Sequence, residues 1–287
     1  MSPRGDSDNL LVQARSALLD ALEALSEHRD AVIVIGAQAI YLHTGNALVA
    51  LAEATKDNDL ALDPRQLDDD PLLEEAMTRA GFHLNTFSGQ PGAWMNRAGI
   101  PVDLMVPEDL AGIGTKNTRG ARIPPHHKSA TRRARGLEAA VIDNSFMDIS
   151  ALDESDSRSY RARVAGPAAL LVAKIHKIAE RADSPHRLND KDAHDIYRLL
   201  VAIDTAPIAA TLKTLLNDPL SRPATIYALN QLDVLFAQGP ESLGSTMAGR
   251  AEEGIGDPAN VALAVSLLAM DILAEMGTNP TGDEIWT

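Results

Sequence analysis

The sequence contains no cysteine among its 287 residues. This absence excludes disulfide scaffolds, thiolate-ligated zinc sites and cysteine nucleophiles. The polar N-terminus, MSPRGDSDN, is not followed by the apolar region of a signal peptide, so we expect no secretion. The near-apolar stretch from Ala31 to Leu42 is far shorter than the ~20 residues that a membrane helix needs. We therefore expect a soluble, cytoplasmic protein with no membrane partner.

Positive charge is scarce. Lys and Arg number 26 against 40 Asp and Glu, and the net charge of −14 disfavours a protein that coats nucleic acid. One stretch reverses this balance, because residues 111–137 contain no Asp or Glu. Two interpretations are open: a solvated loop, or a surface that binds the phosphates of RNA. Its basic residues are Lys116, Arg119, Arg122, Lys128, Arg132, Arg133 and Arg135.

The length and the apolar content of 45% predict two domains with substantial cores. Helix and strand patterns are mixed up to about residue 165, and only helical patterns follow Pro167. We expect an α+β fold, with a small mixed-sheet domain over residues 1–165 and an all-helical domain over residues 166–287. The predicted helices of the first domain are 10–25, 38–43 and 67–80, and its predicted strands are 31–35, 57–62, 82–86, 93–97, 101–106, 137–142 and 146–149.

Three aspartates fall in predicted strands. Side chains alternate along a strand, so Asp57 and Asp59 point to one face of the sheet. Asp103 is the only charged residue in Pro101–Pro107 (PVDLMVP), where an unpaired buried carboxylate would be costly. Like charges held together repel unless a cation lies between them. A lone D-x-D is usually a surface loop, but if these strands are neighbours the three carboxylates predict a two-metal Mg²⁺ site.

Two predicted helices carry charges beside apolar stripes. One helix places Lys174, Lys177 and Arg181 in a row, which either extends toward solvent or aims a lysine into a cleft. The other places Asp192 on its core-facing side, so this carboxylate needs a cationic partner, and Lys174 and Arg187 are the candidates. An ion pair that locks two helices together and a catalytic role are both open.

The motifs, taken in chain order, resemble the AbiEii/MenT-like nucleotidyltransferase toxins, a family within the DNA polymerase β-like superfamily. The resemblance covers roughly residues 30–200, and its specificity lies in the ordered set rather than in any one motif. The set comprises Gly36-Ala37, Thr55-x-Asp57-x-Asp59-Leu60, Val102-Asp103-Leu104, Lys174 with Arg181, and Lys191-Asp192-x-x-Asp195.

The resemblance implies a Mg²⁺-dependent transfer of a nucleotide from an NTP to an acceptor hydroxyl, with pyrophosphate leaving. In MenT-type members the acceptor is tRNA and a cognate antitoxin restrains the enzyme. By the same resemblance, Gly36, Ala37, Thr55, Lys174 and Arg181 bind the nucleotide, Asp57, Asp59 and Asp103 hold the metal, and these acids with Lys174 and Asp192 form the catalytic set.

Two positions depart from the family pattern. Ala37 stands where relatives carry Ser or Gly, so backbone N–H groups must replace a hydroxyl on the phosphates. Glu53 stands where relatives often have Arg, which leaves nucleotide selectivity open. Two rival functions are the same reaction on a small molecule or protein, and a non-catalytic nucleotide-binding or partner-binding module of the same fold.

Overall fold

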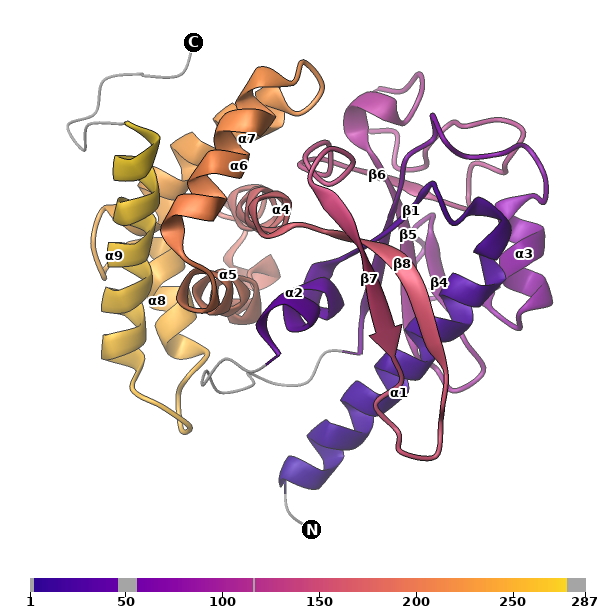
Figure 1. The fold of residues 1–287 in the computed structure, drawn as a ribbon, viewed down its shortest axis with the longest axis horizontal. Coiled ribbons are helices and arrows are strands. Elements are labelled where there is room, and N and C mark those ends of the chain that lie inside the picture. Colours follow the sequence, from indigo (N-terminus) through magenta and orange to yellow (C-terminus); the bar gives the residue numbers. More distant parts are fainter. Residues whose placement is uncertain (1–2, 46–55, 116, 278–287) are drawn as a thin grey trace. The chain divides into compact units, whose positions relative to one another are not determined.

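The computed structural model describes residues 3–45, 56–115 and 117–277. The described chain divides into two compact units, and the main division falls between Ala165 and Gly166. Helix α2 (Gly36–Thr44) begins in the first unit, but its residues from Ile40 onward group with the second. The first unit is mixed α and β, and the second is helical, as the sequence pattern predicts (Figure 1).

The first unit is built on a mixed eight-stranded sheet in the order β3-β4-β5-β2-β1-β8-β7, with β6 paired to β5. Strands β1 and β2 run antiparallel, whereas β5 and β8 lie parallel to β2 and β1 respectively. The unbroken apolar run of β1 is fully buried, because β1 lies at the centre of the sheet. The strands are β1 (Val32–Ile35), β2 (Asn58–Leu62), β3 (His83–Leu84), β4 (Ala93–Met95), β5 (Pro101–Pro107), β6 (Arg132–Ala134), β7 (Asn144–Ser150) and β8 (Ser159–Ala165).

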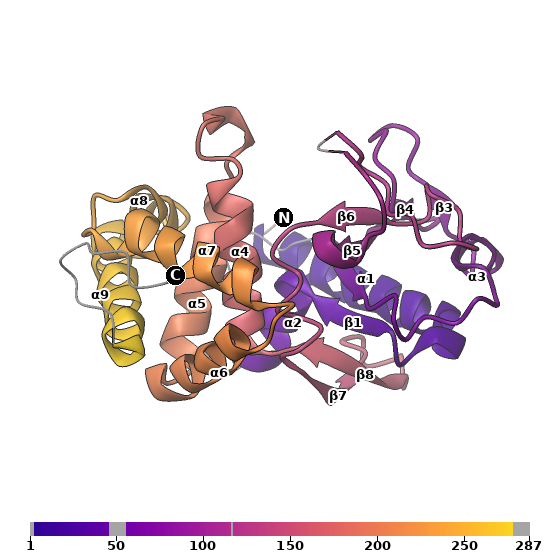
Figure 2. The ribbon, with the colours of Figure 1, turned by 90° about the horizontal axis from the view of Figure 1, so that it is seen from above.

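Helix α1 (Pro3–Ala24) lies along the sheet and contacts β2, β5 and β8 (Figures 1 and 2). Its apolar residues at helical spacing, among them Leu18 and Leu22, are buried. Helix α3 (Leu73–Arg79) packs against α1. Single helical turns at Ser26–His28 and Glu108–Leu110 complete the described helical segments of this unit.

The second unit contains a set of packed helices. Helix α5 contacts α4, α8 and α9, so it lies at the centre of this unit. The helices are α4 (Pro167–Ala179), α5 (Asp190–Ala202), α6 (Thr205–Asn217), α7 (Arg222–Leu232), α8 (Leu243–Arg250) and α9 (Pro258–Met276), with a 3₁₀ turn at Pro185–Arg187 and a π-helical turn at Asp233–Ala237.

Helix α9 is a longer apolar segment than the stretch from Ala31 to Leu42. Among the described residues it is the one unbroken helix that is long and apolar enough to cross a membrane, judged by length and composition alone. Its residues Val265, Ala269 and Ile272 are fully buried against the other helices of the unit. One face of α9 therefore belongs to the helical core, as in the core helix of a globular protein.

Four element predictions were wrong. Residues 137–142 are turns, because local bonds such as that from Ala140 N–H to the Leu137 carbonyl replace a strand ladder. The predicted helix 67–80 starts only at Leu73, since Pro71 disfavours helical backbone at the residue before it. Two strands were not predicted. The basic stretch contains β6, so it is not a loop throughout, and β8 follows the last predicted strand, which ended at residue 149.

Candidate functional site

Asp59 and Asp103 are direct neighbours across two strands. Strands β2 and β5 are parallel, and their register pairs Asp59 with Asp103. Paired residues of adjacent strands share one face of a sheet, so the two carboxylates lie on the same face. Both residues are partly exposed, whereas the next residues along each strand, Leu60 and Leu104, are fully buried. The alternation predicted from the sequence therefore places these two acids together at the solvent side.

Gly36 lies against the Asp59 carboxylate. It is the first residue of α2 and has a φ of +67°, in the left-handed region that glycine favours. A Cβ atom at this position would collide with a carboxylate oxygen of Asp59. The N-terminal end of a helix carries partial positive charge, which suits a nearby carboxylate. The neighbouring Ala37 is only 6% exposed, so its side chain belongs to the core.

Asp57 lies one residue before the start of β2 and is exposed. Among the described residues, no group of three Asp, Glu, His or Cys side chains is arranged to hold a metal ion. The pair Asp59 and Asp103 is thus brought together by the sheet, and the contribution of Asp57 to a metal site stays a prediction. Thr55 and Glu53 lie outside the described residues.

Arg132 forms an ion pair with one of these two acids. Strand β6 runs parallel to β5, and the Arg132 guanidinium donates to Asp103 Oδ2 at 2.7 Å. The side chains are 21% and 28% exposed, so this ion pair is partly shielded from water. The sequence prediction of Arg132 as an RNA contact missed this pairing, because nothing in the local sequence indicated that β6 would lie beside β5.

The remaining basic residues of the 111–137 stretch divide into two groups. Arg133 is held inside the unit: its guanidinium pairs with Glu108 at 3.3 Å and donates to the Ala111 and Gly112 carbonyls at 2.8 Å. Because its side chain is 7% exposed and these contacts occupy its guanidinium, Arg133 has a structural role, and its assignment to RNA stays a prediction. Lys116 lies outside the described residues. The exposed members of the stretch are Arg119, Arg122, Lys128 and Arg135.

The helical unit contains a buried cluster of charges centred on Lys174. Its ammonium donates to Asp192 Oδ1 at 2.8 Å and to Asp195 Oδ2 at 2.6 Å. The Lys174 side chain is 9% exposed, and the two carboxylates are 5% and 3% exposed. Of the two cationic partners expected for Asp192, the structure thus selects Lys174, and the ion pairs join α4 to α5.

Two pKa values in this cluster are strongly displaced. Burial by itself would lower the pKa of Lys174, but attraction to Asp192 and Asp195 outweighs it and holds this pKa above its usual value. Burial would raise the pKa of Asp192, but Lys174 and then Lys177 hold this pKa well below its usual value. Lys174 and Asp192 are therefore both charged at neutral pH. Nearby, burial and the charge of Asp195 raise the pKa of Tyr41 to about 12.

Two further cations, one in α4 and one just after it, contact Asp192 from the more exposed side of the cluster. Lys177 donates to Asp192 Oδ1 at 2.8 Å, and Arg181 lies 3.6 Å from Asp192 Oδ2. Their side chains are 41% and 30% exposed, so a ligand can reach them more readily than Lys174. Arg181 also lines a cavity of about 760 Å³ together with Arg187 and Arg250. Asp190 also lines this cavity and accepts from the Arg250 guanidinium at 2.9 and 2.7 Å, so one of the three cations is already paired.

Comparison of the chain with protein families, with curated proteins and with solved structures finds no match. The structure on its own defines an α+β protein with a mixed sheet and a helical C-terminal region. Its functional interpretation therefore depends on the geometry of the two charged clusters described above.

Proposed function

We propose that this protein is a Mg²⁺-dependent nucleotidyltransferase, which transfers a nucleotide from an NTP to the hydroxyl of an RNA acceptor. The observation that carries the proposal is the pairing of Asp59 with Asp103 beside Gly36 at the start of α2. In the resembling family a Gly-[Ser/Gly] turn and a D-x-D strand, in this chain order, form the nucleotide site, and the chain departs from that turn only at Ala37. The family resemblance further suggests the 3′ end of tRNA as acceptor and a toxin restrained by an antitoxin.

The residues at this site fit a magnesium ion by their chemistry. Mg²⁺ prefers hard oxygen ligands and is usually bound by one or two carboxylates, with water and phosphate oxygens completing its shell. Asp59 and Asp103 supply two such carboxylates on one face of the sheet. Asp57 would add a third carboxylate.

Each residue of the site has a physical task in the proposed reaction. The acceptor oxygen forms a bond to the α-phosphorus while the bond to the bridging oxygen breaks, and pyrophosphate leaves. When bound, Mg²⁺ would activate the acceptor hydroxyl and neutralise phosphate charge. Asp59 and Asp103 would hold the metal ion that brings positive charge to the phosphates, and Gly36 lets the start of α2 approach Asp59 without a side chain between them.

In the helical unit, the resemblance assigns a triphosphate contact to Lys174 and an orienting role to Asp192. Lys174 commits two of its three N–H groups to Asp192 and Asp195. Within the same cluster Lys177 and Arg181 are the more exposed cations. We therefore propose that Lys174 orders the cluster, and that Lys177 and Arg181 present its positive charge to phosphate.

The test is a transfer assay with α-labelled NTPs, an RNA acceptor and Mg²⁺. Asp59→Asn and Asp103→Asn should each abolish label transfer. Asp59→Asn should leave the melting temperature unchanged or raised, since it removes one of two neighbouring like charges, whereas Asp103→Asn also loses the ion pair with Arg132. Asp69→Asn removes an exposed acid elsewhere in the sheet unit and should leave transfer unchanged. Full transfer by the Asp59→Asn and Asp103→Asn variants would contradict the proposal.

A non-catalytic nucleotide-binding module is the second candidate. The ion pair between Arg132 and Asp103 favours it, because a carboxylate that the chain itself neutralises has less need of a metal. The same assay separates the two candidates. A module of this kind binds NTP in a calorimeter but transfers no label to any acceptor, with or without Mg²⁺.

A further inference from the structure

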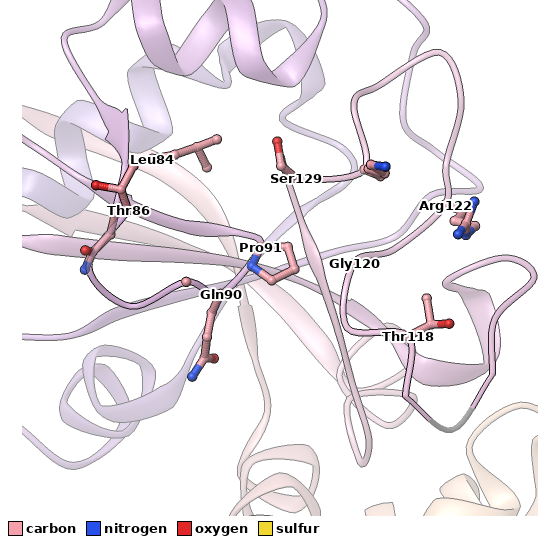
Figure 3. Close-up of a pocket in the computed structure, with 11 residues that line it drawn as sticks. Leu84, Thr86, Gln90, Pro91, Thr118, Gly120, Arg122 and Ser129 are labelled. Atoms are coloured by element: carbon pink, nitrogen blue, oxygen red, sulfur yellow. The ribbon is translucent and has the colours of Figure 1, made fainter.

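The sheet unit contains a cavity that the paired aspartates do not line. A cavity of about 430 Å³ lies between the loop that joins β3 to β4 and the segment from Thr118 to Ser129. Figure 3 shows Thr86 and Gln90 on one side of this cavity and Thr118 and Arg122 on the other. We call this space the hairpin cavity.

The lining of the hairpin cavity suits an anion. It includes the cations Arg122 and Lys128, and its further polar side chains are hydroxyls and amides, such as Thr86, Gln90 and Ser129. None of the described residues that line it is acidic, although the chain as a whole carries a net charge of −14. Arg122 and Lys128 are exposed, and cations with hydroxyl and amide donors are the groups that bind phosphate oxygens.

A large aromatic residue lies in the loop that forms one wall of the cavity. Phe87 lies between Thr86 and Gly89, which both line the cavity, and it is 99% exposed. Its loop is ordered by Asn85, whose Oδ1 accepts from the backbone N–H groups of Phe87 and Ser88 at 3.1 and 3.2 Å. The fold thus presents an aromatic ring to solvent on a fixed turn, and packing within the described chain gives no reason for it.

We propose that the hairpin cavity binds an unpaired nucleotide of an RNA strand. The phosphates contact Arg122 and Lys128, and the base stacks on the ring of Phe87. Proteins that bind single-stranded nucleic acid combine a positive groove with an aromatic side chain in this way, and every base has a face that can stack. This inference deepens the proposed function and depends on it, since it identifies the acceptor as RNA with an unpaired end.

The position of the cavity suits such an acceptor. Pro91 lines the cavity, and two residues later Ala93 of β4 pairs with Asp103 of β5. A hydrogen bond from Gly92 N–H to the Ser129 carbonyl joins the two walls of the cavity at the same point. The wall that includes Pro91 is thus continuous in the chain with the strand that pairs with Asp103. Duplex RNA does not fit, because its bases are stacked on one another and do not reach Phe87.

The experiment measures binding of a short fluorescent oligouridine by anisotropy, without NTP or Mg²⁺. Phe87→Leu keeps an apolar side chain but removes the stacking face, and should weaken binding about tenfold. Phe87→Tyr should bind as the parent does. Arg122→Ala with Lys128→Ala should weaken binding and reduce the slope of log K against log salt by about 0.7 for each phosphate that the variant no longer binds.

The matched control removes two exposed cations of the same unit that do not line the cavity, Arg79→Ala with Arg97→Ala, and should leave the slope nearly unchanged. Unchanged binding by Phe87→Leu overturns the proposal, even if the Arg122 and Lys128 variant binds more weakly. Equal competition by a duplex of the same length overturns it as well. Failure of the proposed function is distinct, because then the oligouridine binds through Phe87 but no NTP is transferred.

Discussion

Replacement of Lys174 by methionine tests the buried charge cluster most directly. The substitution keeps the length of the side chain but removes the cation that contacts both Asp192 and Asp195. Asp192 retains Lys177 and Arg181 as neighbours. Among the described residues, Asp195 has no other cation in ion-pair contact, so it becomes an uncompensated buried charge. Removal of one partner from a buried pair costs about 3–5 kcal/mol, and we expect this loss in the free energy of unfolding.

The measurement is urea denaturation of the helical signal, with two further variants. Lys177→Met removes a cation that is 41% exposed, and should cost less than about 1 kcal/mol. Adding Asp195→Asn to Lys174→Met should recover most of the lost stability, because it removes the charge that has no partner in the single variant. Equal losses in Lys174→Met and Lys177→Met, or no recovery in the double variant, would refute the role given to Lys174.

Two other substitutions test the remaining geometry. The pKa of Asp192 in the folded protein lies below its ordinary value of 3.8, so its contribution to stability is complete above that pH and is lost as the pH falls further. Asp192→Asn should therefore weaken the fall of the unfolding free energy at acid pH. An unchanged fall would contradict the assigned charge state. Gly36→Ala should lower the free energy of unfolding by about 1–3 kcal/mol because of the positive φ, and should reduce transfer about 10²-fold by displacing Asp59. Gly99→Ala is the control, because it has the same backbone cost but open space around its Cβ. Comparable transfer by the two variants would show that the contact with Asp59 is not needed.

Several local features were predictable because short-range physics decides them. The alternation of side chains in a strand placed Asp59 on the face opposite Leu60, and the buried run Val32–Ile35 formed the expected strand. Because a buried Asp192 needs a cationic partner, Lys174 was predicted as one of two candidates, and the structure pairs the two residues. These outcomes follow from periodicity and from the cost of a buried charge, which are both visible in sequence.

Other features depend on which segments become neighbours, and sequence patterns carry little of that information. The short strand β6 is rich in arginine and has no apolar alternation, so only its pairing with β5 identified it as a strand. That pairing directs Arg132 to Asp103 and encloses Arg133, although both residues share the charge and local sequence of an RNA-binding segment. The apolar run 137–142 formed turns, because local hydrogen bonds satisfied its backbone.

The sequence by itself determined the division into a mixed first unit and a helical second unit, and the identity of the acids and cations that could serve as a site. Composition and periodicity are enough for this, because they specify which faces of each element must be buried. Only the tertiary structure decided that Asp59 pairs with Asp103, that Arg132 neutralises an acid while Arg122 lines a cavity, and that the Phe87 side chain is exposed to solvent. Register and strand order set these neighbours, and both arise from contacts between residues far apart in the chain.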